Sequence, residues 1–86
     1  MDIENFYTIM LTGLKSIIER GVQTEADLNV LQGSATILIT HKPNYFGNGE
    51  IFDNMSEQKR EKILAQGALD YLISIKDEMK TRFSMN

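Results

Sequence analysis

The sequence contains no cysteine and no tryptophan, and it has one histidine and one proline. Without cysteine the chain can form no disulfide, and with a single histidine it cannot build a Cys/His zinc site within one chain. Nine lysines and arginines stand against twelve acids, which gives a net charge of −3. Neither half of the chain concentrates the positive charge that binding to a phosphate backbone requires. We therefore expect no metal, no other cofactor and no nucleic-acid partner.

Long apolar runs are absent as well. The longest uncharged segment, residues 28–41, is interrupted by polar residues and by Gly33, so we expect no membrane span. The first four residues carry two acids and no base, unlike a secretory signal. Together with the absence of cysteine, this leads us to expect a cytoplasmic protein. A chain of 86 residues is long enough for one small domain, residues 1–86.

Apolar residues recur with helical spacing in two segments, 2–20 and 56–83. The first set is Ile3, Phe6, Tyr7, Met10, Leu14, Ile17 and Ile18, and the second is Ala65, Ala68, Leu69, Leu72, Ile75, Met79 and Phe83. Asp2 is a candidate cap for the first helix, and Asn54 or Ser56 for the last. Gly21 stands where a left-handed residue often ends a helix.

Two features of these predicted helices point to close contacts. Gly13 lies on the apolar face of the first segment, where a glycine weakens a helix by about 1 kcal/mol relative to alanine. Close approach of another helix explains it most simply. The last segment, 56–83, would form a helix about 40 Å long, which exceeds what a compact monomer of this size needs and favours contact between subunits.

The middle segment, 24–42, is ambiguous. Thr24 and Asp27 have the spacing of a capped helix start, and Pro43 would end such a helix. The β-branched residues in 36–40 instead favour a strand at 35–41 that returns through a hairpin ending near residue 53. The capping position and the length of the pattern favour the helix. We predict an all-α, three-helix arrangement with a long loop before the last helix, and an α+β fold with a hairpin at about 35–53 is the alternative.

This middle segment has very little charge. From Leu28 to Gly49 only Lys42 carries a formal charge, and apolar residues point to more than one side of the predicted helix. Such a helix must be covered on more than one side, for which a short chain has little material. We predict a subunit interface and a homo-oligomer, of which a dimer is the simplest. The interface residues that we expect are Val30, Ser34, Ile37 and Ile39.

The loop at 41–55 is the one place in the sequence that resembles a ligand site. It contains the only histidine and the only proline, together with aromatic residues and glycines, and it is long for a connection between helices. An aromatic ring could stack on a planar group and Lys42 could meet an anion, so a small anionic, nucleotide-like ligand is one interpretation. The residues that we assign to this site are His41, Lys42, Asn44, Tyr45 and Phe46. The other interpretation is structural, with Phe46 and Phe52 filling the end of the helix bundle.

No residue pattern specifies a reaction. His41 could act with Ser34 or Ser56, but no G-x-S-x-G elbow is present, and Glu50 and Asp53 have no specific spacing. We therefore expect no catalytic residues and no enzyme. Two functions remain, and the first is a non-enzymatic interaction protein, a small acidic regulator or inhibitor that acts through an apolar surface on a protein partner or on itself. The alternative is a small-molecule binding or sequestering protein whose ligand site is formed by the 41–49 loop. This site could also lie at a subunit interface.

Overall fold

A computed structural model describes residues 3–76 and residue 78. This part of the chain contains three α-helices, α1 (Ile3–Arg20), α2 (Glu25–His41) and α3 (Glu57–Ser74), with a short 3-10 helix, η1 (Glu50–Phe52), before α3. No strand occurs among the described residues. The predicted all-α, three-helix fold is confirmed, and the alternative hairpin at 35–53 is wrong.

The start of α2 explains why the middle segment is a helix despite its β-branched residues. Thr24 has an extended backbone, and its hydroxyl accepts the Asp27 N–H at 3.1 Å. The Asp27 carboxylate in turn accepts the Gln23 N–H at 3.0 Å, so the first turn of the helix is bonded back to the residue before its N-cap. The helix then continues until the Lys42 N–H donates to the Leu38 carbonyl at 2.7 Å, directly before Pro43.

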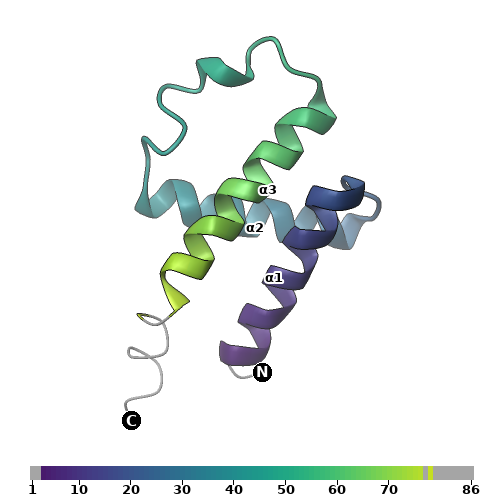
Figure 1. Ribbon diagram of the computed structural model, residues 1–86, viewed down its shortest axis with the longest axis vertical. Coiled ribbons are helices and arrows are strands. Elements are labelled where there is room, and N and C mark those ends of the chain that lie inside the picture. Colours follow the sequence, from purple (N-terminus) through teal and green to yellow (C-terminus); the bar gives the residue numbers. More distant parts are fainter. Residues whose placement is uncertain (1–2, 77, 79–86) are drawn as a thin grey trace.

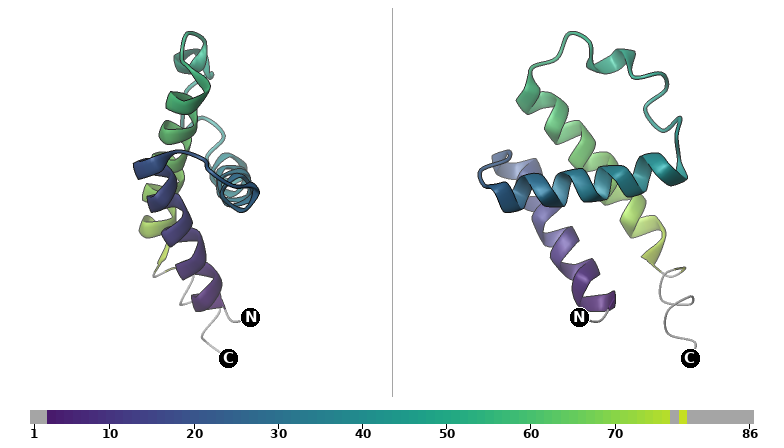
Figure 2. Two further views of the ribbon diagram at one scale, coloured as in Figure 1. Left: turned by 90° about the vertical axis from the view of Figure 1, so that its right-hand side faces the viewer. Right: turned by 180° about the vertical axis from the view of Figure 1, so that it is seen from behind.

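The helices form two layers. In Figure 1, α1 and α3 lie side by side and run in opposite directions, while α2 crosses behind both of them. Figure 2 shows α2 nearly end-on beside that layer, and from behind it lies in front of the other two helices. The shortest dimension of the molecule is 16 Å between Cα atoms, which leaves room for only two layers of helices about 8–10 Å apart. Each helix therefore keeps an outer side.

The core lies where the three helices meet. The side chains of Leu14, Ile17, Leu38, Ala65 and Ala68 have no exposed surface, and they come from all three helices. Partly buried residues surround them. The core thus ties α2 to the layer formed by α1 and α3.

One polar side chain reaches into this core. Tyr7 of α1 is 7% exposed, and its hydroxyl donates to the Leu72 carbonyl of α3 at 2.9 Å. The bond joins residues that are 65 positions apart, and it satisfies the polar end of a ring that is otherwise buried among apolar neighbours. It holds the antiparallel pair α1 and α3 in one register.

The predicted apolar face of the first helix is only partly correct. Tyr7, Met10, Leu14 and Ile17 are buried, but Phe6 is 42% exposed. Because α2 crosses α1 at Gly13, it covers the side of α1 that carries this glycine only near the crossing. The same side of α1 is left open nearer the N-terminus.

The helix boundaries follow the predicted caps where these are described. Gly21 has φ +78°, and its N–H donates to the Ile17 carbonyl at 2.7 Å, which confirms the left-handed end of α1. At the start of α3 it is Ser56, and not Asn54, whose hydroxyl accepts the Lys59 N–H at 3.2 Å. Asp2, the candidate cap of α1, lies outside the described residues.

The last helix is shorter than predicted. We expected it to span 56–83, but α3 ends at Ser74, and Ile75 forms a turn before helical backbone at Lys76 and Glu78. The Ser74 hydroxyl donates to the Tyr71 carbonyl at 2.7 Å, where it competes with the backbone bond from Ile75. Eighteen residues give a helix of about 27 Å, shorter than the length of about 40 Å that we expected. The expected positions Met79 and Phe83 lie outside the described residues.

Gly13 confirms the predicted close approach of a helix. A Cβ atom at this position would lie 2.9 Å from Cγ1 of Val30 on α2. That distance is shorter than real Cβ contacts allow, and a valine side chain is stiff at χ1 and cannot easily turn away. Gly13 therefore sets how closely α2 crosses α1.

Candidate functional site

The predicted ligand loop is a chain of turns that leads from α2 to α3. The Tyr45 N–H donates to the Lys42 carbonyl at 3.0 Å, and the Gly47 N–H donates to the Asn44 carbonyl at the same distance. Gly47 and Gly49 both have positive φ, so the backbone can reverse at two points where other residues would be strained. The loop is therefore ordered by its own backbone bonds, and η1 completes the connection.

The aromatic residues of the loop form a cluster that rests on α3. The Phe46 ring lies edge-on to Tyr45 at 4.8 Å and to Phe52 at 5.3 Å between ring centroids. A Cβ atom at Gly67 would lie 2.7 Å from Cζ of Phe46 and 3.0 Å from Cε1 of Tyr45. Gly67 thus provides the space in which both rings contact the helix. These contacts support the structural interpretation of Phe46 and Phe52.

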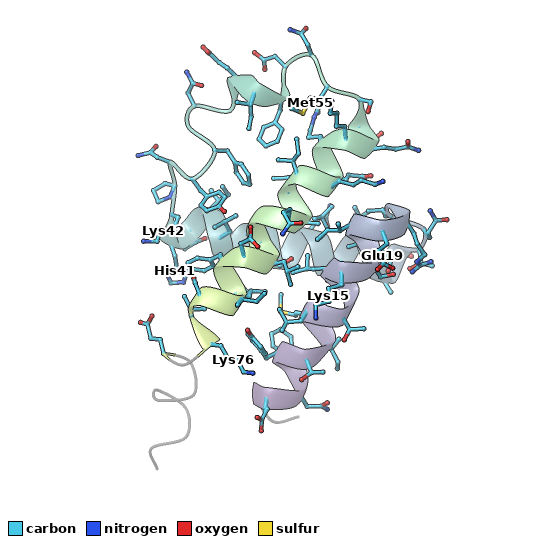
Figure 3. All side chains as sticks on the ribbon, in the orientation of Figure 1. Lys15, Glu19, His41, Lys42, Met55 and Lys76 are labelled. Carbon is cyan, nitrogen blue, oxygen red and sulfur yellow. The ribbon has the colours of Figure 1, made fainter. Side chains whose placement is uncertain are left out.

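The loop is also tied to the start of α3. One guanidinium nitrogen of Arg60 donates to the Phe52 carbonyl and to the Met55 carbonyl, each at 3.3 Å. Met55 lies at the far end of the loop from Lys42 (Figure 3). The 42–56 connection is thus held both by its rings and by a side chain of α3.

The structure separates the five predicted ligand residues into two groups. Tyr45 and Phe46 belong to the aromatic cluster, although Tyr45 remains 45% exposed. His41 ends α2, and its ring stacks on Tyr71 of α3 with centroids 6.2 Å apart. Lys42 and Asn44 are exposed, and Figure 3 shows His41 and Lys42 together at the end of α2. The Tyr45 and Phe46 rings, which we expected to stack on a ligand, thus pack edge-on against each other and contact α3 at Gly67.

The other sequence candidates for chemistry have structural roles. The Ser34 hydroxyl is buried and donates to the Val30 carbonyl at 2.5 Å, while the Ser56 hydroxyl caps α3. Among the described residues no group of three or more acidic, histidine or cysteine side chains is arranged to hold a metal ion. Each serine hydroxyl is thus bonded to the backbone of its own helix.

The four predicted interface residues occupy different environments. Ser34 is 1% exposed and Val30 contacts Gly13, so both are covered inside one chain. Ile37 is half-buried against the core, and Ile39 is 41% exposed. The covering that we expected from a second copy is thus supplied, on the inner side of α2, by α1 and α3.

The outer side of α2 has a different composition. Its exposed residues, which we call the outer face, are uncharged and mostly small: Asn29, Gln32, Gly33, Thr36 and Thr40. Two exposed apolar residues, Leu28 (37%) and Ile39 (41%), flank it on one side. No described element lies over α2 when the molecule is seen from behind (Figure 2, right). The outer face is therefore an uncharged helix surface open to solvent.

Gly33 distinguishes the outer face from the rest of the helical surface. Three glycines lie inside helices, and a Cβ atom would collide with a neighbour at Gly13 and at Gly67 but would meet nothing within 4 Å at Gly33. A glycine in the middle of an exposed helix weakens it by about 1 kcal/mol relative to alanine. Contacts within the described chain give no reason for Gly33.

A second group of exposed apolar residues lies on α1. Phe6 is 42% exposed and Ile9 is 47% exposed, on the side of α1 that carries Gly13. The apolar spacing of the sequence assigned Phe6 to the core and did not include Ile9. Gly13 marked in the sequence where another helix comes close, but its position alone could not show how much of this side that helix leaves open.

Comparison of the chain with protein-family models, with curated proteins and with solved structures gave no match. In the part of the chain that the structure describes, none of the helices combines the length and apolar character that crossing a bilayer requires. The candidate site therefore rests on geometry alone.

Proposed function

We propose that this chain is a non-enzymatic interaction protein, a small acidic regulator or inhibitor, and that it binds protein through the outer face of α2. The observation that carries the proposal is an exposed helix surface without a formal charge, from Leu28 to Thr40, on a chain in which 24% of residues are charged. Charged residues are depleted at the centres of protein interfaces, because burying them costs solvation free energy.

The flanks of this face support the same proposal. Leu28 and Ile39 expose apolar surface beside small polar side chains, a combination that allows close contact without leaving a large group unsatisfied. Short polar side chains such as Thr36 lose little rotamer freedom when a partner covers them. The outer face is thus suited to binding another folded surface.

A photo-crosslinking residue at Thr36 tests this proposal in the cells that make the protein. We expect ultraviolet light to yield an adduct of defined mass from Thr36, and we expect none from the same residue at Thr12, an exposed position on α1. Equal labelling from both positions, or no adduct from Thr36, would overturn the proposal. The mass of the adduct separates a second copy of the chain from a different protein.

The alternative function, binding of a small anionic ligand at the 41–49 loop, keeps one supporting observation. Lys42 and part of the Tyr45 ring are exposed three positions apart. If a nucleotide-like compound binds there, it raises the melting temperature of the wild-type protein, and Lys42→Ala removes that increase without changing the fold. A broad nucleotide panel that gives no thermal shift would exclude this alternative.

A further inference from the structure

We infer that the partner of the outer face is a second copy of this chain, with two α2 helices packed antiparallel about a twofold axis beside Gly33. This inference rests on the proposed interaction function and names its partner. A twofold axis that relates two antiparallel helices places residues at equal distances on its two sides opposite each other. With the axis between residues 33 and 34, residue 33 + k of one copy lies near residue 34 − k of the other, where k is any whole number. The described residues fit this arrangement in three independent ways.

The first is the glycine at the centre. A Cβ atom added at Gly33 would meet no atom of the described residues within 4 Å, whereas the other two helical glycines each admit a side chain from another element. If Gly33 follows the same rule, the element that approaches it belongs to another molecule. On a twofold axis the closest approach of two helices falls at the centre, where the smallest residue is needed.

The second is the apolar flank. Leu28 and Ile39 lie on the same side of α2 and are both exposed, at 37% and 41%. In the antiparallel arrangement Leu28 of one copy lies opposite Ile39 of the partner, because the two positions are equally distant from the axis. The symmetry repeats this contact on the other half of the interface, so both exposed apolar residues become covered in both copies.

The third is the charge at the two ends of α2. Glu25 lies at the start of the helix and Lys42 follows its end, and both are exposed. A helix of 17 residues separates them by about 25 Å, so they cannot meet within one chain. The register that pairs Leu28 with Ile39 also brings Glu25 near Lys42 of the second copy, on both ends of the interface. The antiparallel orientation opposes the helix dipoles as well.

A chain with net charge −3 would otherwise repel its own copy. The outer face avoids this repulsion because it has no acid between Asp27 and the end of α2, and its two ends carry opposite charge. A charged partner of either sign would match one end of the face and oppose the other. A second copy is the partner that matches both.

Gly33→Gln provides the main test with purified full-length protein. Glutamine is a good helix former and position 33 is open in the single chain, so the variant should fold at least as well as the wild type. In light scattering from micromolar to millimolar concentration, we expect the wild type to reach twice 9.8 kDa. We expect Gly33→Gln to dimerise at least tenfold more weakly and the matched control Thr12→Gln to be unchanged.

A charge exchange tests the register independently of Gly33. Glu25→Lys and Lys42→Glu should each weaken the dimer by about three- to fivefold, the range of an exposed ion pair made twice. The double variant should recover wild-type dimerisation, even though both changes oppose the helix dipole and lower the melting temperature. Recovery of association without recovery of stability can come only from contact between copies.

The outcomes separate this inference from the proposed function. A wild-type chain that stays monomeric at millimolar concentration overturns the homodimer, and a crosslink from Thr36 to a protein of different mass would then still support an interaction function. A dimer that is unaffected by Gly33→Gln, or that the charge exchange does not rescue, overturns the antiparallel arrangement.

Discussion

The inner and outer faces of α2 have the same lack of charge and opposite surroundings. On the inner face, Leu31, Ser34 and Leu38 are at most 4% exposed, and Leu31 belongs to one core cluster with residues of α1 and α3. On the outer face, Gly33 and Thr36 are exposed and nothing in the described chain covers them. One short helix therefore carries a core surface on one side and, on the other, a surface that resembles the centre of an interface.

The difference shows how a lack of charge should be interpreted in a short chain. The lack of charge identified α2 as a helix that other elements should cover, and α1 and α3 cover its inner side. The other half remains open because two layers of helices leave an outer side on every helix. Substitutions on the two faces can therefore separate folding from association.

The largest expected effect comes from placing a charge on the inner face. Leu38 has no exposed surface, so Leu38→Asp buries an unpaired carboxylate and removes core volume. We expect a loss of at least about 4 kcal/mol, enough to unfold most domains of this size. Circular dichroism during thermal unfolding measures it. Thr36→Asp, two residues away on the outer face, should retain the helical signal, and unfolding of both variants would mean that the faces are not distinct.

An intermediate effect is expected where α2 crosses α1. Gly13→Ala should lower the free energy of unfolding by about 1–2 kcal/mol, because the strain against Val30 exceeds the gain in helix propensity. Urea titration of each variant gives this value. In a Val30→Ala background the same change should be neutral or stabilising. An equal loss in both backgrounds would show that Gly13 is needed for a reason other than contact with Val30.

The opposite sign is expected at the open glycine. Gly33→Ala should raise the free energy of unfolding of the monomer by about 1 kcal/mol, because alanine favours the helix and its Cβ meets no neighbour. Urea titrations at decreasing protein concentration isolate the monomer. A loss of stability at high dilution would indicate that some element of the same chain covers the outer face.

The smallest effect is a dependence of stability on concentration. If copies associate through the outer face, the wild-type melting temperature rises with protein concentration, by a few degrees for each tenfold step. Differential scanning fluorimetry over several concentrations measures the slope. Gly33→Gln should have a flat profile, and a parallel slope in both proteins would place any association on another surface.

The sequence predicted which segments are helical, but it predicted less well where the last helix ends and which apolar residues are buried. Thr24 and Gly21 were correctly assigned to helix ends, because a cap depends on residues within one turn of each other. The end of α3 was missed, since the Ser74 hydroxyl bond to Tyr71 interrupts an apolar pattern that continues beyond it. Phe6 was assigned to the core because its spacing is that of the buried residues around it.

The same limit applies to the candidate site. The loop aromatics stood out in the sequence, but their spacing could not show that Gly67, more than twenty residues away, provides the space for Phe46. The uncharged segment was found correctly, yet Val30 and Ser34 are covered within the chain and Gly33 is not. Which side of a helix is covered depends on residues distant in sequence.

The amino-acid order alone determined three helices, most of their ends, and a middle helix poor in charge, because propensity, capping and periodicity act over a few residues. Only the tertiary structure decided which side of α2 faces the core, which side chains Gly13 and Gly67 admit, and that no described residue covers Gly33. These are consequences of crossing positions and layer number, which arise from contacts between segments far apart in the chain.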